Sequence, residues 1–154
     1  MHPSRAKASK NSLLRNDRMT DLELIEKAKK AAENAYAPYS GYTVGAALIS
    51  KSGRLYTGCN IENAAYGPTN CAERTAFFKA VSEGEREFSK IAVVGGKDLS
   101  FTDYFSPCGV CRQVMREFCN DDFVILLGKN NEEYMSVTLA ELLPHSFSKN
   151  NIDK

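Results

Sequence analysis

Residues 70–94 read NCAERTAFFKAVSEGEREFSKIAVV, and they hold a helix pattern followed by a strand pattern. Asn70 can cap a helix over about 71–83, and Gly84 is placed to end it. Small residues recur along this helix at a spacing that permits close packing, namely Ala72, Ala76 and Ala80. The run at 91–94 is apolar and mostly β-branched, which is typical of a central strand covered on both faces.

The N-terminal side of this stretch adds a helix and a hairpin. Thr20 and Glu23 have the spacing of a capping box, and apolar residues then recur with a helical period, so we expect a helix over about 21–36. Two strand patterns follow at 43–50 and 55–61, and a Ser-Gly turn joins them.

The C-terminal side alternates helix and strand again. Pro107 precedes a predicted helix over about 108–119. Apolar residues mark the side of this helix that we expect to be buried, namely Val110, Val114 and Phe118. Strand patterns follow at 123–127 and 134–137, and a short helix then stops at Pro144. The whole pattern predicts an α/β fold, a three-layer α/β/α sandwich with a mixed sheet of about five strands.

The charge of the chain is unevenly distributed. Residues 1–19 carry a net charge of +4 and the remainder carries −3, which gives the chain +1. A slightly acidic body offers no basic face to a nucleic-acid backbone, so we expect a small-molecule ligand and no nucleic acid. A chain of 154 residues suits one domain. We therefore expect a disordered basic tail at 1–19, a folded domain at 20–147 and a flexible C-terminal tail at 148–154.

The sequence shows no targeting signal for a membrane. No run approaches the roughly 18 consecutive apolar residues of a membrane helix, and the N-terminus lacks the apolar core of a secretion signal. We expect a soluble cytoplasmic protein without a membrane partner, although the basic tail leaves an organelle-targeting segment open.

Three of the five cysteines are candidate metal ligands: Cys108 and Cys111 by their spacing, and Cys71 only if the fold brings it to them. Cys71 and Cys108 open predicted helices, where free N–H groups and the helix dipole favour the thiolate form that binds metal. Cys111 lies three residues after Cys108, so both side chains share one helix face and can hold one tetrahedral ion. Three protein ligands leave a position open for water, so we expect one catalytic Zn²⁺ per chain.

Two charged residues follow Cys71. Glu73 can approach an ion that lies beyond the helix end, and Arg74 can donate hydrogen bonds to thiolate sulfurs and offset their negative charge. A structural zinc site in a noncatalytic interaction domain stays open as an alternative. In that case Cys59, Cys119 or His145 supplies a fourth ligand, whereas our main interpretation makes both cysteines packing residues.

Segments along the chain resemble the small zinc-dependent cytidine deaminases of the homotetrameric, three-cysteine type. In chain order they are Y-A-P-Y-S (36–40), V-G-A-A-L (44–48), G-C-N-I-E-N-A-A-Y (58–66), C-A-E-R-T-A (71–76), A-V-S-E-G (80–84), S-P-C-G-V-C-R-Q (106–113) and E-L-L-P (141–144). The resemblance spans residues 20–147 and implies a cytidine deaminase-like catalytic domain.

The resemblance also implies an activity and a site. Cytidine and deoxycytidine would be hydrolysed to uridine, deoxyuridine and ammonia in pyrimidine salvage. Water on zinc would attack C4 while Glu73 takes its proton, protonates N3 and later helps ammonia leave. Asn60 and Glu62, two apart on a predicted strand, would point to one side and bind ribose hydroxyls.

Further contacts are implied for five residues. The backbone N–H of Ala72 would contact the zinc-bound oxygen, and Tyr42 and Phe147 would line the pocket for the ring and sugar. Ala64 and Tyr66 would reach the site of a neighbouring subunit, because relatives of this length form homotetramers with shared active sites. Tyr42 stands where we expect Phe from the family pattern.

Two other enzymatic functions stay open. A related deaminase of another aminopyrimidine nucleoside, such as a blasticidin-type antibiotic, would also use three cysteines. An enzyme that edits RNA or DNA would need a groove for flanking nucleotides and a more basic surface than this chain offers.

Overall fold

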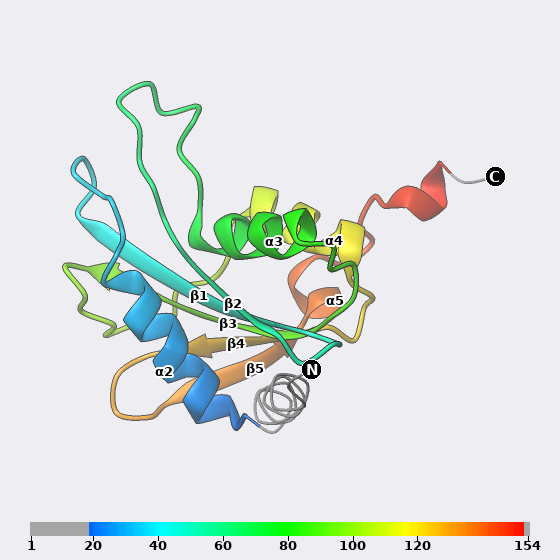
Figure 1. Cartoon of the computed structure of the whole chain (residues 1–154), viewed down its shortest axis with the longest axis horizontal. Helices are drawn as coiled ribbons and strands as arrows, with labels where there is room; N and C mark the ends of the chain where they lie inside the picture. The colour runs from blue at the N-terminus through cyan, green and yellow to red at the C-terminus, as the bar shows by residue number, and fades with distance from the viewer. Residues whose placement is uncertain (1–18, 153–154) are drawn as a thin grey trace, which may run out of the picture.

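Five strands form one mixed sheet in the order β2-β1-β3-β4-β5 in the computed structural model, which describes residues 19–152 (Figure 1). The strands are β1 (Tyr42–Ser50), β2 (Leu55–Cys59), β3 (Phe88–Lys97), β4 (Val124–Gly128) and β5 (Tyr134–Thr138). Strand β1 pairs antiparallel with both β2 and β3, β3 pairs parallel with β4, and β4 pairs antiparallel with β5. The hairpin and the central position predicted for residues 91–94 are therefore confirmed.

Helices cover both faces of this sheet (Figure 1). They are α2 (Asp21–Ala32), α3 (Ala72–Ser82), α4 (Gly109–Phe118), the short α5 (Leu139–Leu142) and the 3-10 helix η1 (Lys149–Asn151). The apolar side of α2 packs on one face with alternate residues of β1, β3 and β4. The opposite residues of the same strands pack with α3, α4 and α5. Two cores on either side of one sheet confirm the predicted three-layer α/β/α sandwich.

Two glycines allow helices to lie directly against the sheet. A methyl group at Gly45 in β1 would overlap the backbone of α2 at Ala28. A methyl group at Gly58 in β2 would overlap the backbone of α3 at Ala72 and Ala76. The small-residue stripe predicted on α3 therefore brings the start of that helix against the sheet.

Several predicted boundaries were wrong. The first helix ends at Ala32 rather than near residue 36, and Cys71 rather than Asn70 is the N-cap of α3. Strand β3 runs from Phe88 to Lys97, well beyond the predicted 91–94, because Gly95 and Gly96 stay in the strand and pair with β1. On α4, Cys111 and Met115 are buried, and the predicted Val114 and Phe118 are partly buried against the same core, so only Val110, which is exposed, was placed wrongly.

The two ends of the described chain differ in their contacts with the sandwich. Of the predicted basic tail at 1–19, only Met19 is among the described residues, and it packs against the core beneath α2. At the other end, η1 stands away from the body (Figure 1). Within residues 19–152, no helix combines the length and apolar character needed to cross a bilayer.

Candidate metal centre and active site

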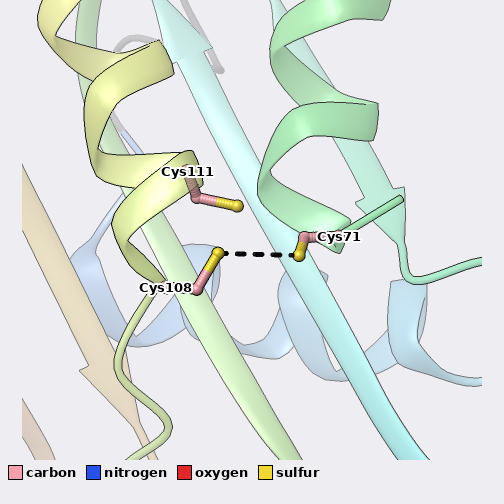
Figure 2. Close-up of side chains that lie close together, drawn as sticks. All are labelled: Cys71, Cys108 and Cys111. Carbon is pink, nitrogen blue, oxygen red and sulfur yellow. Dashed lines mark hydrogen bonds between the residues drawn. The ribbon is translucent and has the colours of Figure 1, made fainter. Parts of the chain in front are cut away.

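Three cysteine sulfurs converge between the first turns of α3 and α4 (Figure 2). The Sγ atoms of Cys71, Cys108 and Cys111 all lie within 4.8 Å of one another, and those of Cys71 and Cys108 are 3.9 Å apart. Sulfurs bound at about 2.3 Å to one tetrahedral zinc lie about 3.8 Å apart, so the spacing fits zinc. Within the described part of the chain no fourth His, Cys, Asp or Glu joins this group.

Helix geometry places two of these ligands. Cys71 and Cys108 are the N-cap residues of α3 and α4, both in extended backbone conformation, and neither side chain makes a capping hydrogen bond. Their sulfurs are therefore free to point away from the helix ends towards a shared ion. Cys111 lies in the first turn of α4 and is buried, and its sulfur points towards the other two (Figure 2).

Arg112 holds the loop that leads into α4. Its Nε donates a 2.7 Å hydrogen bond to the Pro107 carbonyl, and its Nη2 donates one of 2.8 Å to the Ser106 hydroxyl. Its Nη1 donates to the Leu142 carbonyl at the end of α5. Three bonds from one guanidinium thus tie the backbone just before Cys108 to the C-terminal part of the fold.

The electrostatics around the sulfurs favour thiolate at Cys71. A hydrogen bond with the Cys111 thiol, aided by the Arg74 guanidinium and opposed by burial, lowers the pKa of Cys71 to about 5. The same bond raises the pKa of Cys111, which keeps its proton. Arg74 Nη2 donates to Cys71 Sγ over 3.3 Å, as predicted for a counter-charge. A divalent ion that displaces the remaining protons would stabilise all three thiolates together.

Glu73 is buried next to this cluster. Its exposed fraction is 2%, and its Oε1 has no hydrogen-bond partner among the described residues. Burial raises the pKa of Glu73 above its ordinary value, and the charge of Cys71 acts in the same direction. An unsatisfied buried carboxylate oxygen is costly to maintain, so it marks a position where a ligand or water completes the site.

A cavity of about 430 Å³ opens beside the metal centre. This volume lies within the range of about 300–1,000 Å³ that is usual for small-molecule sites. Its lining combines the metal centre with residues of β1, the loop after β2 and the loop before α4: Ser40, Tyr42, Val44, Asn60, Glu62, Thr69, Asn70, Cys71, Ala72, Glu73, Phe105, Ser106 and Cys108. Four of the predicted substrate residues, Tyr42, Asn60, Glu62 and Ala72, are in this set.

Asn60 and Glu62 reach the cavity from a loop and not from a strand. Strand β2 ends at Cys59, so the predicted strand geometry was wrong for this pair. The Asn60 side chain is instead fixed by β1: Val44 N–H donates to its Oδ1 over 2.9 Å, and its Nδ2 donates to the Tyr42 carbonyl over 2.7 Å. The carboxylate of Glu62 accepts hydrogen bonds from the turn at residues 39–40.

The other predicted residues lie outside this cavity. Tyr66 and Phe147 are 76% and 62% exposed, and neither lines the cavity of its own chain. Ala64 is also exposed, in the long loop between β2 and α3 that projects from the body (Figure 1). Gln113 Nε2 holds the Phe147 carbonyl over 2.9 Å, which fixes the backbone beside this side chain.

Sequence reasoning missed six residues that line the cavity: Ser40, Val44, Thr69, Asn70, Phe105 and Ser106. The ring of Phe105 packs over Gly95, so closely that a methyl group on Gly95 would overlap the ring. The ring centroids of Phe105 and Tyr42 are 6.3 Å apart. Gly95 in a strand pattern is the one local signal of such close packing. The serines lie in loops, where no periodicity marks a functional side chain.

Metal, acid and cavity together set the class of the protein. A three-cysteine metal site with no fourth protein ligand among residues 19–152, which shares a cavity with a buried glutamate, is the arrangement of a zinc-dependent hydrolase. The family model for the cytidine and deoxycytidylate deaminase zinc-binding region matches residues 18–127. The chain therefore belongs to this deaminase family, and the predicted zinc cofactor is confirmed.

Individual relatives agree with this assignment. The chain is 52% identical over 130 residues to a cytidine deaminase of Sporosarcina psychrophila, a match that covers 84% of this chain and 93% of the relative. It is 32% identical over 134 residues to a blasticidin-S deaminase of Bacillus cereus, and this match covers 84% of this chain and 94% of that relative. The crystal structure of a cytidine deaminase from Burkholderia pseudomallei superposes on this structure with a TM-score of 0.78 at 46% identity. The match covers 84% of this chain and 100% of that chain.

Proposed function

We propose that the protein hydrolyses cytidine and deoxycytidine to uridine and deoxyuridine with release of ammonia. The observation that carries this proposal is the shared cavity, whose lining includes Glu73, the two zinc ligands Cys71 and Cys108, and the polar residues Asn60 and Glu62. Such a cavity can hold a nucleoside with its base at the metal and its sugar at the polar wall. The identity to relatives that are named cytidine deaminase supports the choice of cytidine.

The metal is held by Cys71, Cys108 and Cys111, with Arg74 as the counter-charge at Cys71. The chemistry that zinc supplies in such a site is the activation of water as a nucleophile near neutral pH. Arg74 reduces the excess negative charge of three thiolates, which would otherwise weaken this activation.

Glu73 moves the protons of the reaction. Its carboxylate accepts one proton of the attacking water and donates it to N3 of the pyrimidine ring. It then takes the second proton from the hydroxyl group now on C4 and delivers it to the amino group, which leaves as ammonia while the C4 carbonyl forms. The raised pKa of Glu73 suits this work, because a carboxyl group that holds its proton closer to neutral pH can both accept and release it.

The other cavity residues bind and orient the nucleoside. Ala72 begins α3 and lines the cavity, which supports a role for its backbone N–H, at the positive end of the helix, as a hydrogen-bond donor to the oxygen that adds at C4. Tyr42 lies against the ring and sugar, while Asn60 and Glu62 take the sugar hydroxyls. Asn60 keeps one N–H and one lone pair free for this purpose after its two backbone bonds.

The cavity favours a nucleoside over a nucleotide. Neither the main cavity nor an adjoining one of about 380 Å³, lined by Tyr39, Ser40, Glu62, Asn63, Tyr66 and Thr69, has a Lys or Arg in its described lining. A phosphate group needs such a cation or a cluster of N–H donors to offset its charge. The carboxylate of Glu62 would repel it instead.

Exposed residues outside the cavity of a single chain support an assembly of copies. Tyr66 and Phe147 present large aromatic side chains to solvent in a single chain. In a homotetramer these residues and Ala64 would complete the cavities of neighbouring subunits, and burial of their surface would stabilise the contact. We place this enzyme in pyrimidine salvage in the cytoplasm, with a catalytic domain at 20–147 that does not need the tails at 1–19 and 148–154 for chemistry.

A second candidate substrate is an antibiotic of the blasticidin type. The relative that acts on it has 32% identity, against 52% for the cytidine deaminase from Sporosarcina psychrophila. Parallel assays on cytidine, deoxycytidine and blasticidin S separate the two functions. Preferred turnover of the antibiotic would replace our proposal.

The decisive experiment combines a cytidine assay with Glu73→Gln. Wild-type protein should release ammonia from cytidine with the ultraviolet change to uridine. Glu73→Gln should retain zinc and fold but lose about 10²- to 10⁴-fold in kcat, because a proton carrier is removed. Glu83→Gln, at the end of the same helix, is the control and should keep wild-type turnover. An unchanged kcat for Glu73→Gln would rule out this mechanism.

A further inference from the structure

The turn at residues 39–42 is bonded to one carboxylate on the cavity wall, that of Glu62. Glu62 Oε1 accepts hydrogen bonds from the N–H groups of Tyr39, at 3.0 Å, and Ser40, at 3.1 Å. Glu62 Oε2 accepts a 2.5 Å bond from the Ser40 hydroxyl. Backbone bonds join the same two segments, since Glu62 N–H donates to the Tyr36 carbonyl over 2.8 Å.

The hydrogen-bond directions at Ser40 are determined. Tyr42 N–H donates to Ser40 Oγ over 3.0 Å, so the hydroxyl oxygen is the acceptor of that bond. The single hydroxyl proton is then free to go to Glu62 Oε2, which can only accept while it is ionised. The bond from Ser40 also lowers the pKa of Glu62, which keeps the carboxylate charged and accepting at neutral pH.

Counting lone pairs leaves one acceptor position for a ligand. A carboxylate offers about four acceptor positions, two on each oxygen. The backbone bonds use both positions of Oε1, and Ser40 uses one of Oε2. The free position is therefore on Oε2, and Ser40 sets the direction in which it points.

We propose that Ser40 is a positioning residue that orients Glu62 Oε2 to accept one hydroxyl group of the substrate sugar. The inference rests on the proposed nucleoside function and adds to it a residue that does not itself need to touch the substrate. Both Ser40 and Glu62 line the main cavity and the adjoining one, so the oriented oxygen lies where a bound sugar would meet the carboxylate. A carboxylate that is fixed before binding loses less side-chain entropy when the substrate arrives.

The hydroxyl must be one that both proposed substrates share. Cytidine and deoxycytidine have the 3′ and 5′ hydroxyls in common and differ at the 2′ position. A residue that serves both substrates through a single acceptor position therefore takes the 3′ or the 5′ hydroxyl.

Steady-state kinetics of Ser40 variants test this inference. Ser40→Ala should raise KM for cytidine about three- to tenfold with little change in kcat, the usual value of one hydrogen bond at a binding site. Ser40→Thr keeps the hydroxyl and should restore a near wild-type KM. Ser82→Ala, which removes a hydroxyl bonded to the Lys79 carbonyl at the far end of α3, is the matched control and should leave both constants unchanged.

Substrate analogues distinguish positioning from a general structural role. The KM effect of Ser40→Ala should persist with 2′-deoxycytidine and disappear with either 3′-deoxycytidine or 5′-deoxycytidine. In a double-mutant cycle, Ser40→Ala should add almost nothing to Glu62→Gln, because both changes act through one carboxylate.

Three outcomes would overturn the inference. They are an unchanged KM for Ser40→Ala, the same increase in KM with every deoxy analogue, and a KM for Ser40→Thr as high as that of Ser40→Ala. These outcomes leave the proposed function intact as long as wild-type protein deaminates cytidine. If wild-type protein turned over neither cytidine nor any of its analogues, the proposed function and this inference would both be overturned.

Discussion

At the scale of single residues, the five cysteines differ in their surroundings, and zinc should accentuate the difference. Cys108 is exposed and Cys71 is half-buried, whereas Cys119 is buried in the core. The hydrogen bond with the Cys111 thiol lowers the pKa of Cys71 to about 5, which favours the thiolate form of Cys71 at neutral pH in metal-free protein. Desolvation by burial raises the pKa of Cys119 to about 12, so Cys119 stays a thiol at neutral pH.

Removal of zinc should therefore unmask selected thiols. With a chelator present at pH 7, iodoacetamide should label Cys71 and Cys108 rapidly, whereas zinc-loaded protein should protect both. Cys119 should stay unlabelled in either state and serves as the internal control. Peptide mass spectrometry measures the labelling, and equal labelling of Cys71 with and without chelator would argue against the zinc site.

The chemistry of the site could be predicted from single residues only where spacing carries information. Cys108 and Cys111 are marked by their separation, and Cys71 with Glu73 by their place at a helix start. Ser40 and Phe105 could not be found in this way, because the folded chain brings their loops to the cavity wall and no local pattern records it. Their signal lies in tertiary contacts such as that of Phe105 with Gly95.

At the scale of elements, the two helices that lie directly on glycines should respond differently to the same substitution. Gly58→Ala would push the start of α3, with Cys71 and Glu73, away from β2. Gly45→Ala would push α2 from the other face of the sheet, away from the metal. Each overpacked variant should lose about 1–3 kcal/mol of stability.

Only Gly58→Ala should also lose zinc more readily and lose kcat. Chemical denaturation measures stability, and competition with a chromogenic chelator measures zinc retention. Gly45→Ala is the matched control, since it carries the same added methyl against the opposite layer. Equal zinc retention in two folded variants would contradict the role that we give to the packing of α3.

The types and the order of the helices and strands could be predicted from the periodicity of apolar residues. The predictions that were wrong, for Val110 and for the length of β3, have physical causes. Val110 was expected on the buried side of α4 because it is apolar, but the sulfur of Cys111 has to face the metal, which turns Met115 inward and Val110 outward. Strand β3 was predicted too short because glycine weakens a strand pattern, whereas Gly95 and Gly96 are needed for close packing against the segment at residues 100–105.

At the scale of the whole molecule, the proposed assembly predicts that activity depends on protein concentration. Phe147→Ala should raise KM for cytidine and make specific activity fall on dilution, because an aromatic side chain would be lost from a neighbour's cavity and from the contact. Light scattering reports the assembly, and progress curves at decreasing protein concentration report the activity. Met135→Ala, an exposed apolar residue on the edge strand β5, is the control. A monomer with full activity at every dilution would exclude shared sites.

The starts of α3 and α4, described above as lacking side-chain caps, give the metal a second task. Both helices begin at a cysteine, at the position where a serine or aspartate side chain usually secures the first turn. One ion thus fastens two helices at once, and its departure would let both first turns fray. Binding of zinc would therefore do two things at once: it would stiffen the first turn that holds Glu73, and it would supply the ion that activates water. Release of zinc would remove both.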